Sequence, residues 1–165
     1  MTRLLSRRRV LGAGGAAALV PVMGRPTAAG AATLGGQIVT LRTAIRVYDS
    51  RTSSILGGMK LGPGDSLDVS VEPAFEGNSF ALAVFLNYSI TETEGSGFLV
   101  LRPTDTSGEA PFPATSNINW WASGLTLGNA SLVAVGSENS IEIHCRGAGR
   151  THVIIDVQGY VPFVT

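Results

Sequence analysis

The sequence is poor in the residues that carry most protein chemistry. Its 165 residues contain one cysteine, Cys145, and two histidines, His144 and His152. A single cysteine excludes an intramolecular disulfide, so folding must rest on burial of a core. Two histidines at this spacing with one cysteine do not form a zinc signature, and Asp65–Asp68 lacks the ligand density of a calcium loop. We therefore expect no metal and no cofactor.

Clustered positive charge is missing from most of the chain. Lys60 is the only lysine, and five of the 12 basic residues precede residue 26, whereas all 12 acidic residues follow residue 31. Residues 32–165 therefore hold seven basic and 12 acidic residues, a net charge of −5. Because phosphate binding depends on clustered lysine and arginine, this balance argues against nucleic acid as a partner.

Long hydrophobic runs are also absent. Val10–Met23 has only 14 residues and includes three glycines and a proline, whereas a membrane-spanning helix needs about 20 apolar residues. The run follows three arginines at residues 7–9 and precedes a segment rich in small residues. This order predicts a twin-arginine export signal over residues 1–31, cleaved after Ala31 or Ala32. We expect the chain to be secreted or associated with the cell envelope, with no stable membrane anchor after cleavage.

Helical periodicity does not occur after residue 33. Short apolar or alternating runs are separated there by glycine, proline, asparagine and aspartate. The pattern predicts an all-β fold, an antiparallel β-sandwich or closed barrel of about eight strands. We interpret residues 32–44 as a leader or linker and residues 45–165 as a single β-sandwich domain. The predicted strands are residues 45–49, 66–71, 80–90, 98–101, 117–121, 132–135, 140–145 and 152–157, with a surface loop over 104–115.

Three segments carry a set of motifs in a fixed order. Arg46–Arg51 reads Arg-Val-Tyr-Asp-Ser-Arg, Thr115–Trp120 reads Thr-Ser-Asn-Ile-Asn-Trp, and Thr151–Val161 contains His-Val-Ile-Ile-Asp-Val-Gln-Gly-Tyr. Together they resemble a β-module of secreted actinobacterial proteins, often present in tandem and fused to cell-wall hydrolases. The module's opening motif has Thr where this chain has Ser50. The resemblance implies an exported β-domain with a binding or structural role, and it supplies no catalytic residues.

The adjacent tryptophans Trp120 and Trp121 are the best binding candidates. Neighbours on a strand point to opposite faces, so one indole should be buried and the other exposed. An exposed indole offers a stacking surface for a sugar ring. Asn117 and Asn119 alternate with Trp121 and would add amide groups on its face. The candidate ligand-binding residues are therefore Trp121, Asn117 and Asn119; alternatively, the second ring covers another sheet or a partner subunit.

Four further polar residues recur at even spacing in the first and last motifs. Asp49 and Arg51 are two apart on one extended segment and share a face, as do His152 and Asp156 on the last predicted strand. At about 3.3 Å per residue, the Cα atoms of His152 and Asp156 lie about 13 Å apart, too far for a direct hydrogen bond. We interpret the four as a structural polar motif, with Arg51–Asp156 as a candidate ion pair. The alternative is a carboxylate in a glycan or cation site.

Evidence for catalysis is weak in this sequence. No Gly-x-Ser-x-Gly elbow is present, and His144 and Cys145, as strand neighbours, point to opposite faces. Cys145 alternates with two isoleucines, so we expect it to be a buried core thiol. We hypothesise an exported domain without catalytic residues that binds cell-wall glycan or an envelope protein. The alternatives are a self-associating structural protein of the envelope and, less favoured, a small hydrolase using His152 with Asp156 or Asp49.

Overall fold

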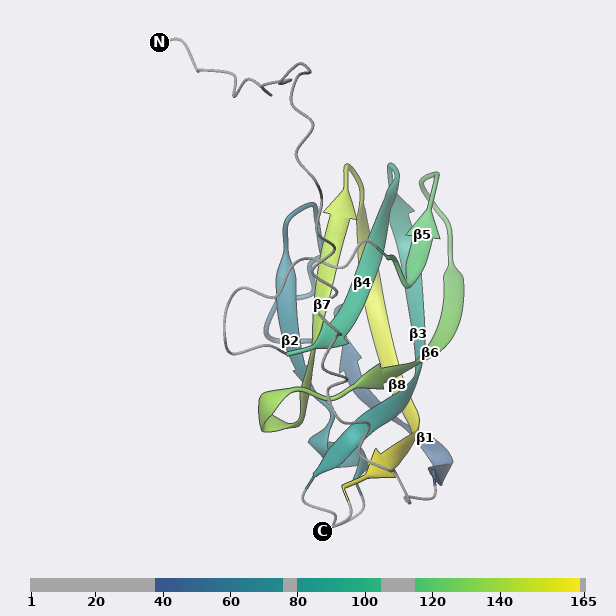
Figure 1. The fold of residues 1–165 in the computed structure, drawn as a ribbon. Coiled ribbons are helices and arrows are strands. Elements are labelled where there is room, and N and C mark those ends of the chain that lie inside the picture. The colour runs from purple at the N-terminus through teal and green to yellow at the C-terminus, as the bar shows by residue number, and fades with distance from the viewer. Residues whose placement is uncertain (1–37, 76–79, 105–114, 164–165) are drawn as a thin grey trace, which may run out of the picture. The chain divides into compact units, whose positions relative to one another are not determined.

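The computed structural model describes residues 38–75, 80–104 and 115–163. Their strands form two antiparallel sheets of four strands each, stacked as a sandwich (Figure 1). The prediction of an all-β sandwich is confirmed, and the described residues form two separate sheets instead of one closed barrel. The predicted signal over residues 1–31 and most of the predicted loop over 104–115 lie outside the described residues.

Each sheet is built from strands distant in the sequence. The first sheet has the order β1-β8-β3-β6 and the second has the order β2-β7-β4-β5. Two short 3₁₀ turns, η1 and η2, connect strands. The bounds are β1 Val39–Asp49, β2 Ser66–Ser70, η1 Glu72–Ala74, β3 Ala81–Glu94, β4 Gly97–Pro103, β5 Ile118–Trp120, β6 Leu127–Ala134, η2 Ser137–Asn139, β7 Ser140–Gly147 and β8 Arg150–Pro162.

Every predicted strand is found, but two of them begin five or more residues earlier than the sequence pattern indicates. β1 begins at Val39, within the segment interpreted as a leader or linker, because Val39 pairs with Tyr160 of β8. β6 begins at Leu127 instead of residue 132, although Gly128 and Asn129 resemble a turn. Strand β3 supplies a cross-strand partner for every residue of β6, with Ile90 opposite Leu127. In both cases pairing with a neighbouring strand outweighs local preference.

The core lies between the two sheets and is made by alternate residues of the central strands. Full burial of one such aliphatic side chain stabilises the fold by about 1.5–3 kcal/mol. The inner faces of β3, β7 and β8 provide side chains at most 1% exposed: Val84, Leu86, Tyr88, Ile90, Ile141, Ile143, Cys145, Val153, Ile155 and Val157.

Cys145 lies in this core, as predicted. Its side chain is fully buried, and its Sγ lies 3.6 Å from the carbonyl oxygen of Leu61. Burial raises the pKa of the Cys145 thiol to about 11 because the thiolate would lose its hydration. The thiol therefore stays protonated and inaccessible at neutral pH.

We predict that the folded protein resists alkylation. At pH 8, iodoacetamide should modify Cys145 in the folded protein at least about a hundredfold more slowly than in protein unfolded in urea, because only the thiolate reacts. Mass spectrometry of quenched time points measures both rates. Equal rates in the two states would contradict the buried position of Cys145.

Candidate functional site

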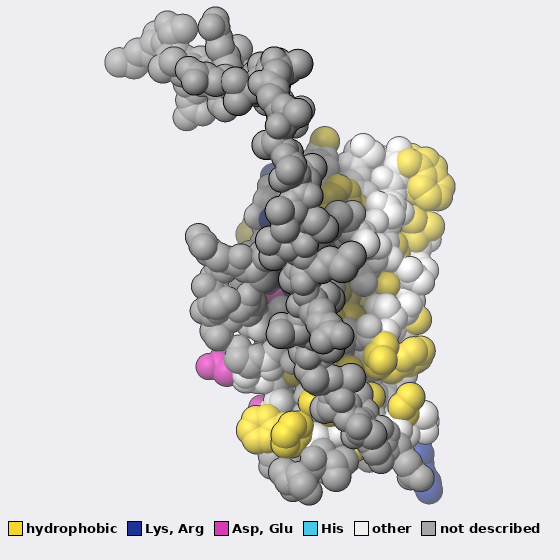
Figure 2. Space-filling view, in the orientation of Figure 1, with side chains coloured by type: hydrophobic (Ala, Val, Ile, Leu, Met, Phe, Trp, Pro, Cys, Tyr) yellow, Lys and Arg dark blue, Asp and Glu magenta, His cyan; other side chains and the backbone are white. Residues whose placement is uncertain are grey.

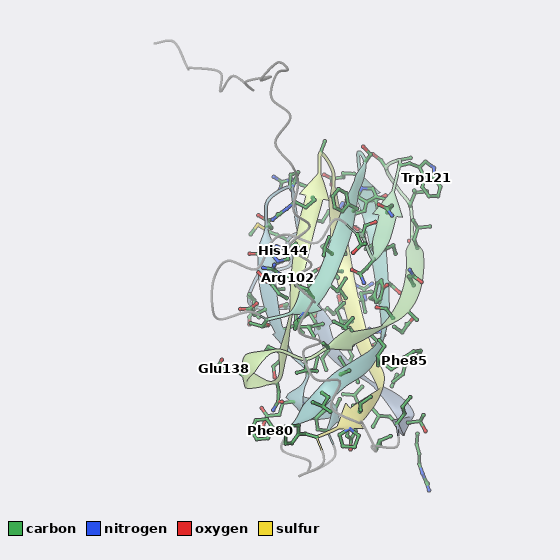
Figure 3. All side chains as sticks on the ribbon, viewed as in Figure 1. Phe80, Phe85, Arg102, Trp121, Glu138 and His144 are labelled. Atoms are coloured by element: carbon green, nitrogen blue, oxygen red, sulfur yellow. The ribbon has the colours of Figure 1, made fainter. Side chains whose placement is uncertain are left out.

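The two adjacent tryptophans point to opposite sides, as predicted. Trp120 is 2% exposed, whereas Trp121 is 72% exposed. The Trp120 ring packs where two glycines leave room for it: a Cβ at Gly97 would lie 2.5 Å from the ring, and one at Gly149 would lie 2.8 Å from Nε1. Nε1 of Trp120 donates a hydrogen bond to the carbonyl oxygen of Glu94. Trp120 is therefore an anchor, and Trp121 extends into solvent at the end of β5 (Figure 3).

The loop that carries Trp121 is held by a buried threonine. Thr93, near the end of β3, is 2% exposed. Its Oγ1 donates to the carbonyl oxygen of Ala122 at 2.7 Å and accepts from Leu125 N at 2.9 Å. The Thr93 carbonyl oxygen accepts from Gly124 N at 2.7 Å. These bonds fix the loop on both sides of its turn, so the exposed indole projects from an ordered base.

The two asparagines expected beside Trp121 have different roles. Oδ1 of Asn117 accepts from Leu101 N at 2.7 Å, which extends the pairing of β4 with the chain before β5. The Asn117 carbonyl oxygen accepts from Tyr88 and Asn129 of the other sheet. Asn117 thus joins the two sheets, and its Oδ1 is already engaged by the backbone.

Asn119 is exposed, as Trp121 is, and lies on the outer face of β5. Its Nδ2 donates to the Ser116 hydroxyl at 2.8 Å, and Phe98 of β4 is its cross-strand partner. Trp121 and Asn119 are therefore the exposed members of the predicted site, one with an aromatic ring and one with an amide.

The polar motif of β1 and β8 is assembled differently from the predicted arrangement. Asp156 is paired with Arg46, whose Nε and Nη2 lie 2.9 and 3.1 Å from its two oxygens. Arg51 instead turns back onto Asp49, with contacts of 2.9 and 2.6 Å. The predicted Arg51–Asp156 ion pair is therefore wrong. Arg46 is the cross-strand partner of Asp156, whereas Arg51 lies beyond the end of β1.

Asp49 is the most strongly held carboxylate of this motif. The Arg51 guanidinium donates to it, Arg51 N donates to Oδ1, and Arg46 Nη1 lies 3.5 Å from Oδ2. The hydrogen bond from Arg51 is the main reason that the pKa of Asp49 lies below its ordinary value of 3.8, and partial burial opposes it. The Asp49 oxygens are thus occupied by protein donors.

His152 makes a contact that the sequence did not indicate. Its Nδ1 lies 2.9 Å from Oγ of Ser50, which is fully buried. Val153 N donates to the same Oγ at 2.9 Å. The Ser50 hydroxyl thus lies between His152 Nδ1 and Val153 N, and Nε2 of the same ring lies 4.0 Å from a Glu92 oxygen. The sequence offers one signal for this contact. Ser50 stands where the opening motif of the β-module that the chain resembles has Thr, and both side chains carry a hydroxyl.

A second ionic cluster lies on the outer face of the other sheet. Glu142 accepts a hydrogen bond from Arg102 Nε at 2.7 Å and lies 2.9 Å from His144 Nε2; Arg102 and His144 are labelled in Figure 3. Burial alone would raise the pKa of Glu142, but the hydrogen bonds from Arg102 and His144 bring it below its ordinary value. Sequence reasoning missed this cluster because it tested His144 only against Cys145. The alternation in β7 places Glu142 and His144 on one face and is the signal that would have shown it.

Within residues 38–75, 80–104 and 115–163, no three His, Cys, Asp or Glu side chains are grouped so as to hold a metal ion. Nor does any helix in those ranges have the length and apolar character required to cross a membrane. No protein-family model matches the chain, and no curated protein matches its sequence significantly.

We predict that Ser50→Ala destabilises the fold. The change leaves His152 Nδ1 and Val153 N without their buried partner, which should lower the free energy of unfolding by about 1–3 kcal/mol. Urea denaturation followed by circular dichroism measures the loss. Ser70→Ala, at an exposed end of β2, is the matched control and should change stability by less than about 0.5 kcal/mol. Equal effects of the two substitutions would show that the Ser50 contact is unimportant.

We also predict that Asp49 contributes to stability at neutral pH. Its folded pKa is lowered, so its contribution is present above the ordinary pKa and is lost as pH falls through the folded value. Asp49→Asn should therefore be less stable than the wild type at pH 7, and the two should converge at about pH 2. Thermal unfolding across this range tests the prediction, with the exposed Asp68 on β2 changed to Asn as the control. Parallel profiles of Asp49→Asn and wild type would contradict it.

Proposed function

We propose that the chain is an exported β-domain without catalytic activity that binds a glycan or another surface component of the cell envelope through Trp121. The main support is an indole that is 72% exposed, on a loop held by the buried Thr93. Trp121 is the most exposed of the large hydrophobic side chains among the described residues, and an exposed indole face offers a stacking surface for a sugar ring. Because the loop is already ordered, little conformational entropy is lost when a ligand stacks on the ring.

The chemistry around Trp121 favours a sugar over a charged ligand. Asn119 supplies an amide that can donate to and accept from hydroxyl groups, and the loop residues 121–126 carry no charge. The resemblance of the three motifs to the secreted actinobacterial module, and the predicted twin-arginine signal, agree with a site of action at the cell envelope.

The arrangement of the polar motif is the argument against a hydrolase. A nucleophilic serine needs an accessible oxygen and a base that takes its proton. Ser50 is fully buried and its oxygen also accepts from Val153 N, so no substrate carbonyl can approach it. Asp156 and Asp49 are held by arginines and His152 is held by Ser50. We therefore assign Arg46–Asp156 and Ser50–His152 to holding the β1 segment against β8, and Asp49 to fixing Arg51 within its own segment.

The proposal is tested by retention of the purified protein on insoluble peptidoglycan and on arabinogalactan. Trp121→Ala should weaken binding at least about tenfold, as expected when a central aromatic contact is removed. Phe80→Ala is the matched control, since Phe80 is 61% exposed and lies at the other end of the sandwich (Figure 3). It should bind as the wild type does.

Two outcomes would contradict this function. One is a wild type that is retained on neither polymer, and the other is an equal loss of binding in Trp121→Ala and Phe80→Ala. Because Trp121 is exposed, its removal should leave the unfolding temperature unchanged, and circular dichroism can verify that the variant is folded.

A further inference from the structure

One face of β3 is turned away from the core and carries four uncharged side chains. The residues of β3 alternate between the core and the outer surface of the first sheet. The side chains at positions 84, 86, 88 and 90 are buried in the core, so Phe85, Asn87, Ser89 and Thr91 lie on the outer face. This row therefore begins at an aromatic ring and continues with one amide and two hydroxyls.

The neighbouring strand β6 leaves the middle of this row uncovered. Opposite Asn87 and Ser89 it has Ala130 and Gly128, which are both exposed. A Cβ at Gly128 would lie 3.6 Å from Ser89 Oγ, an ordinary contact distance, so the glycine leaves that side of the hydroxyl open. We call this surface the outer strip; its residues are Phe85, Asn87, Ser89 and Thr91 of β3 with Gly128, Ala130 and Leu132 of β6.

The two polar side chains in the middle of the outer strip are not used by the fold. Asn87 and Ser89 are half-buried, and within the described residues neither side chain makes a hydrogen bond. The side chains of Asn117 and Asn129, by contrast, are bonded to backbone groups. An amide and a hydroxyl can each donate and accept a hydrogen bond. The outer strip thus presents groups that can bind sugar hydroxyls.

The end of the outer strip at Phe85 is apolar. Phe85 is 41% exposed, and Leu132, its cross-strand partner, is 54% exposed. The Cβ atoms of such a pair lie about 5 Å apart, so the two side chains form one continuous apolar surface. The C–H face of a sugar ring can pack on an aromatic ring of this kind, in the way proposed for Trp121.

The opposite end of the outer strip leads toward Trp121. The loop after Trp121 joins β6, and Thr126 Oγ1 lies 2.8 Å from Oγ1 of Thr91, the last residue of the row. Trp121 and Phe85 project from the same side of the sandwich in Figure 3. Figure 2 shows further hydrophobic side chains along that side, separated by uncharged atoms. An aromatic ring therefore lies toward each end of the outer strip.

The outer strip is longer than a single sugar ring. At about 3.3 Å per residue, Leu127 and Leu132 lie about 17 Å apart along β6, and Trp121 comes before Leu127 on the preceding loop. A ligand that contacts both Trp121 and Phe85 must therefore be a chain of several linked units.

The outer strip and the Trp121 loop contain no charged residue, although the domain is acidic. Residues 81–91 and 121–134 are uncharged, whereas residues 32–165 have a net charge of −5. Asp156, which lies opposite Asn87 on β8, is paired with Arg46, and the next charge along β3 is the negative Glu92. An anionic polymer would meet no positive charge on the strip and would be repelled by the domain. The surface therefore matches an uncharged chain rich in hydroxyl groups.

We propose that the glycan bound at Trp121 is an uncharged linear polysaccharide, and that its chain continues along the outer strip to Phe85 and Leu132. This inference rests on the proposed function, which names only the contacts at Trp121 and Asn119. One sugar ring stacks on Trp121, the amide of Asn87 and the hydroxyl of Ser89 bind hydroxyl groups of the chain, and a later ring packs on Phe85. Affinity therefore increases with chain length until both aromatic rings are covered.

Titration calorimetry with uncharged linear oligosaccharides of graded length, prepared from arabinogalactan, tests this extension. The dissociation constant of the wild type should fall at least about tenfold from the disaccharide to the longest chain. Phe85→Ala should bind the disaccharide as the wild type does and lose this gain. Asn87→Ala should bind the longest chain about threefold to tenfold more weakly, because one hydrogen bond is lost. Phe80→Ala, at an equally apolar exposed ring before β3, is the matched control and should keep the gain.

The outcomes separate this inference from the proposed function. Circular dichroism verifies that Phe85→Ala is folded, and Leu132→Ala tests the same end of the strip at a more exposed side chain. A wild type whose affinity does not rise with length, or equal effects of Phe85→Ala and Phe80→Ala, would overturn the extension and leave the Trp121 site in place. A wild type that binds no length, or binding unaffected by Trp121→Ala, would contradict the proposed function itself.

Two further measurements test what occupies the outer strip. Peptidoglycan chains with free carboxylates should bind more weakly than the same chains with amidated carboxylates, and tighter binding of the charged form would overturn the uncharged class. Sedimentation velocity of the protein without ligand tests whether a second copy covers the strip instead. A dimer that Phe85→Ala dissociates would overturn the proposal, whereas a monomer agrees with a surface open to a glycan.

Discussion

The antiparallel docking of β8 between β1 and β3 is the interaction on which the rest of the structure depends. Its inner side chains Val153, Ile155 and Val157 are fully buried. On its other face, Asp156 pairs with Arg46 of β1, and His152 is hydrogen-bonded to Ser50, the residue that follows β1. One strand therefore supplies both a large share of the core and the polar contacts that close the first strand onto the last.

This arrangement matters because the chain contains a single cysteine. Many small exported domains join their terminal segments with disulfides. Here Ser50 accepts from Val153 N through its hydroxyl, and its own N–H donates to the Val153 carbonyl oxygen. These bonds are shielded from water, so breaking one leaves a buried polar group without a partner. Non-covalent bonds of this kind can form in a reducing compartment, which agrees with the proposed export of a folded domain.

The sequence predicts strands well because alternating burial is a local property. Cys145, Trp120 and Trp121 are assigned to the correct faces by parity alone. Pairing between strands is not local. The Arg51–Asp156 prediction was wrong because parity identifies which residues share a face, but not which residue of another strand lies opposite. Bulges in β1 and the end of the strand at Asp49 decide that Arg46 meets Asp156.

The same limit explains what was missed at the candidate site. Asn117 and Asn119 have the same parity as Trp121, yet Asn117 Oδ1 is engaged by Leu101 N of the adjacent strand. The start of β6 was missed because Gly128 and Asn129 favour turns in isolation. Only the presence of β3 makes them part of a strand. Local preference yields to tertiary pairing wherever a partner supplies the hydrogen bonds.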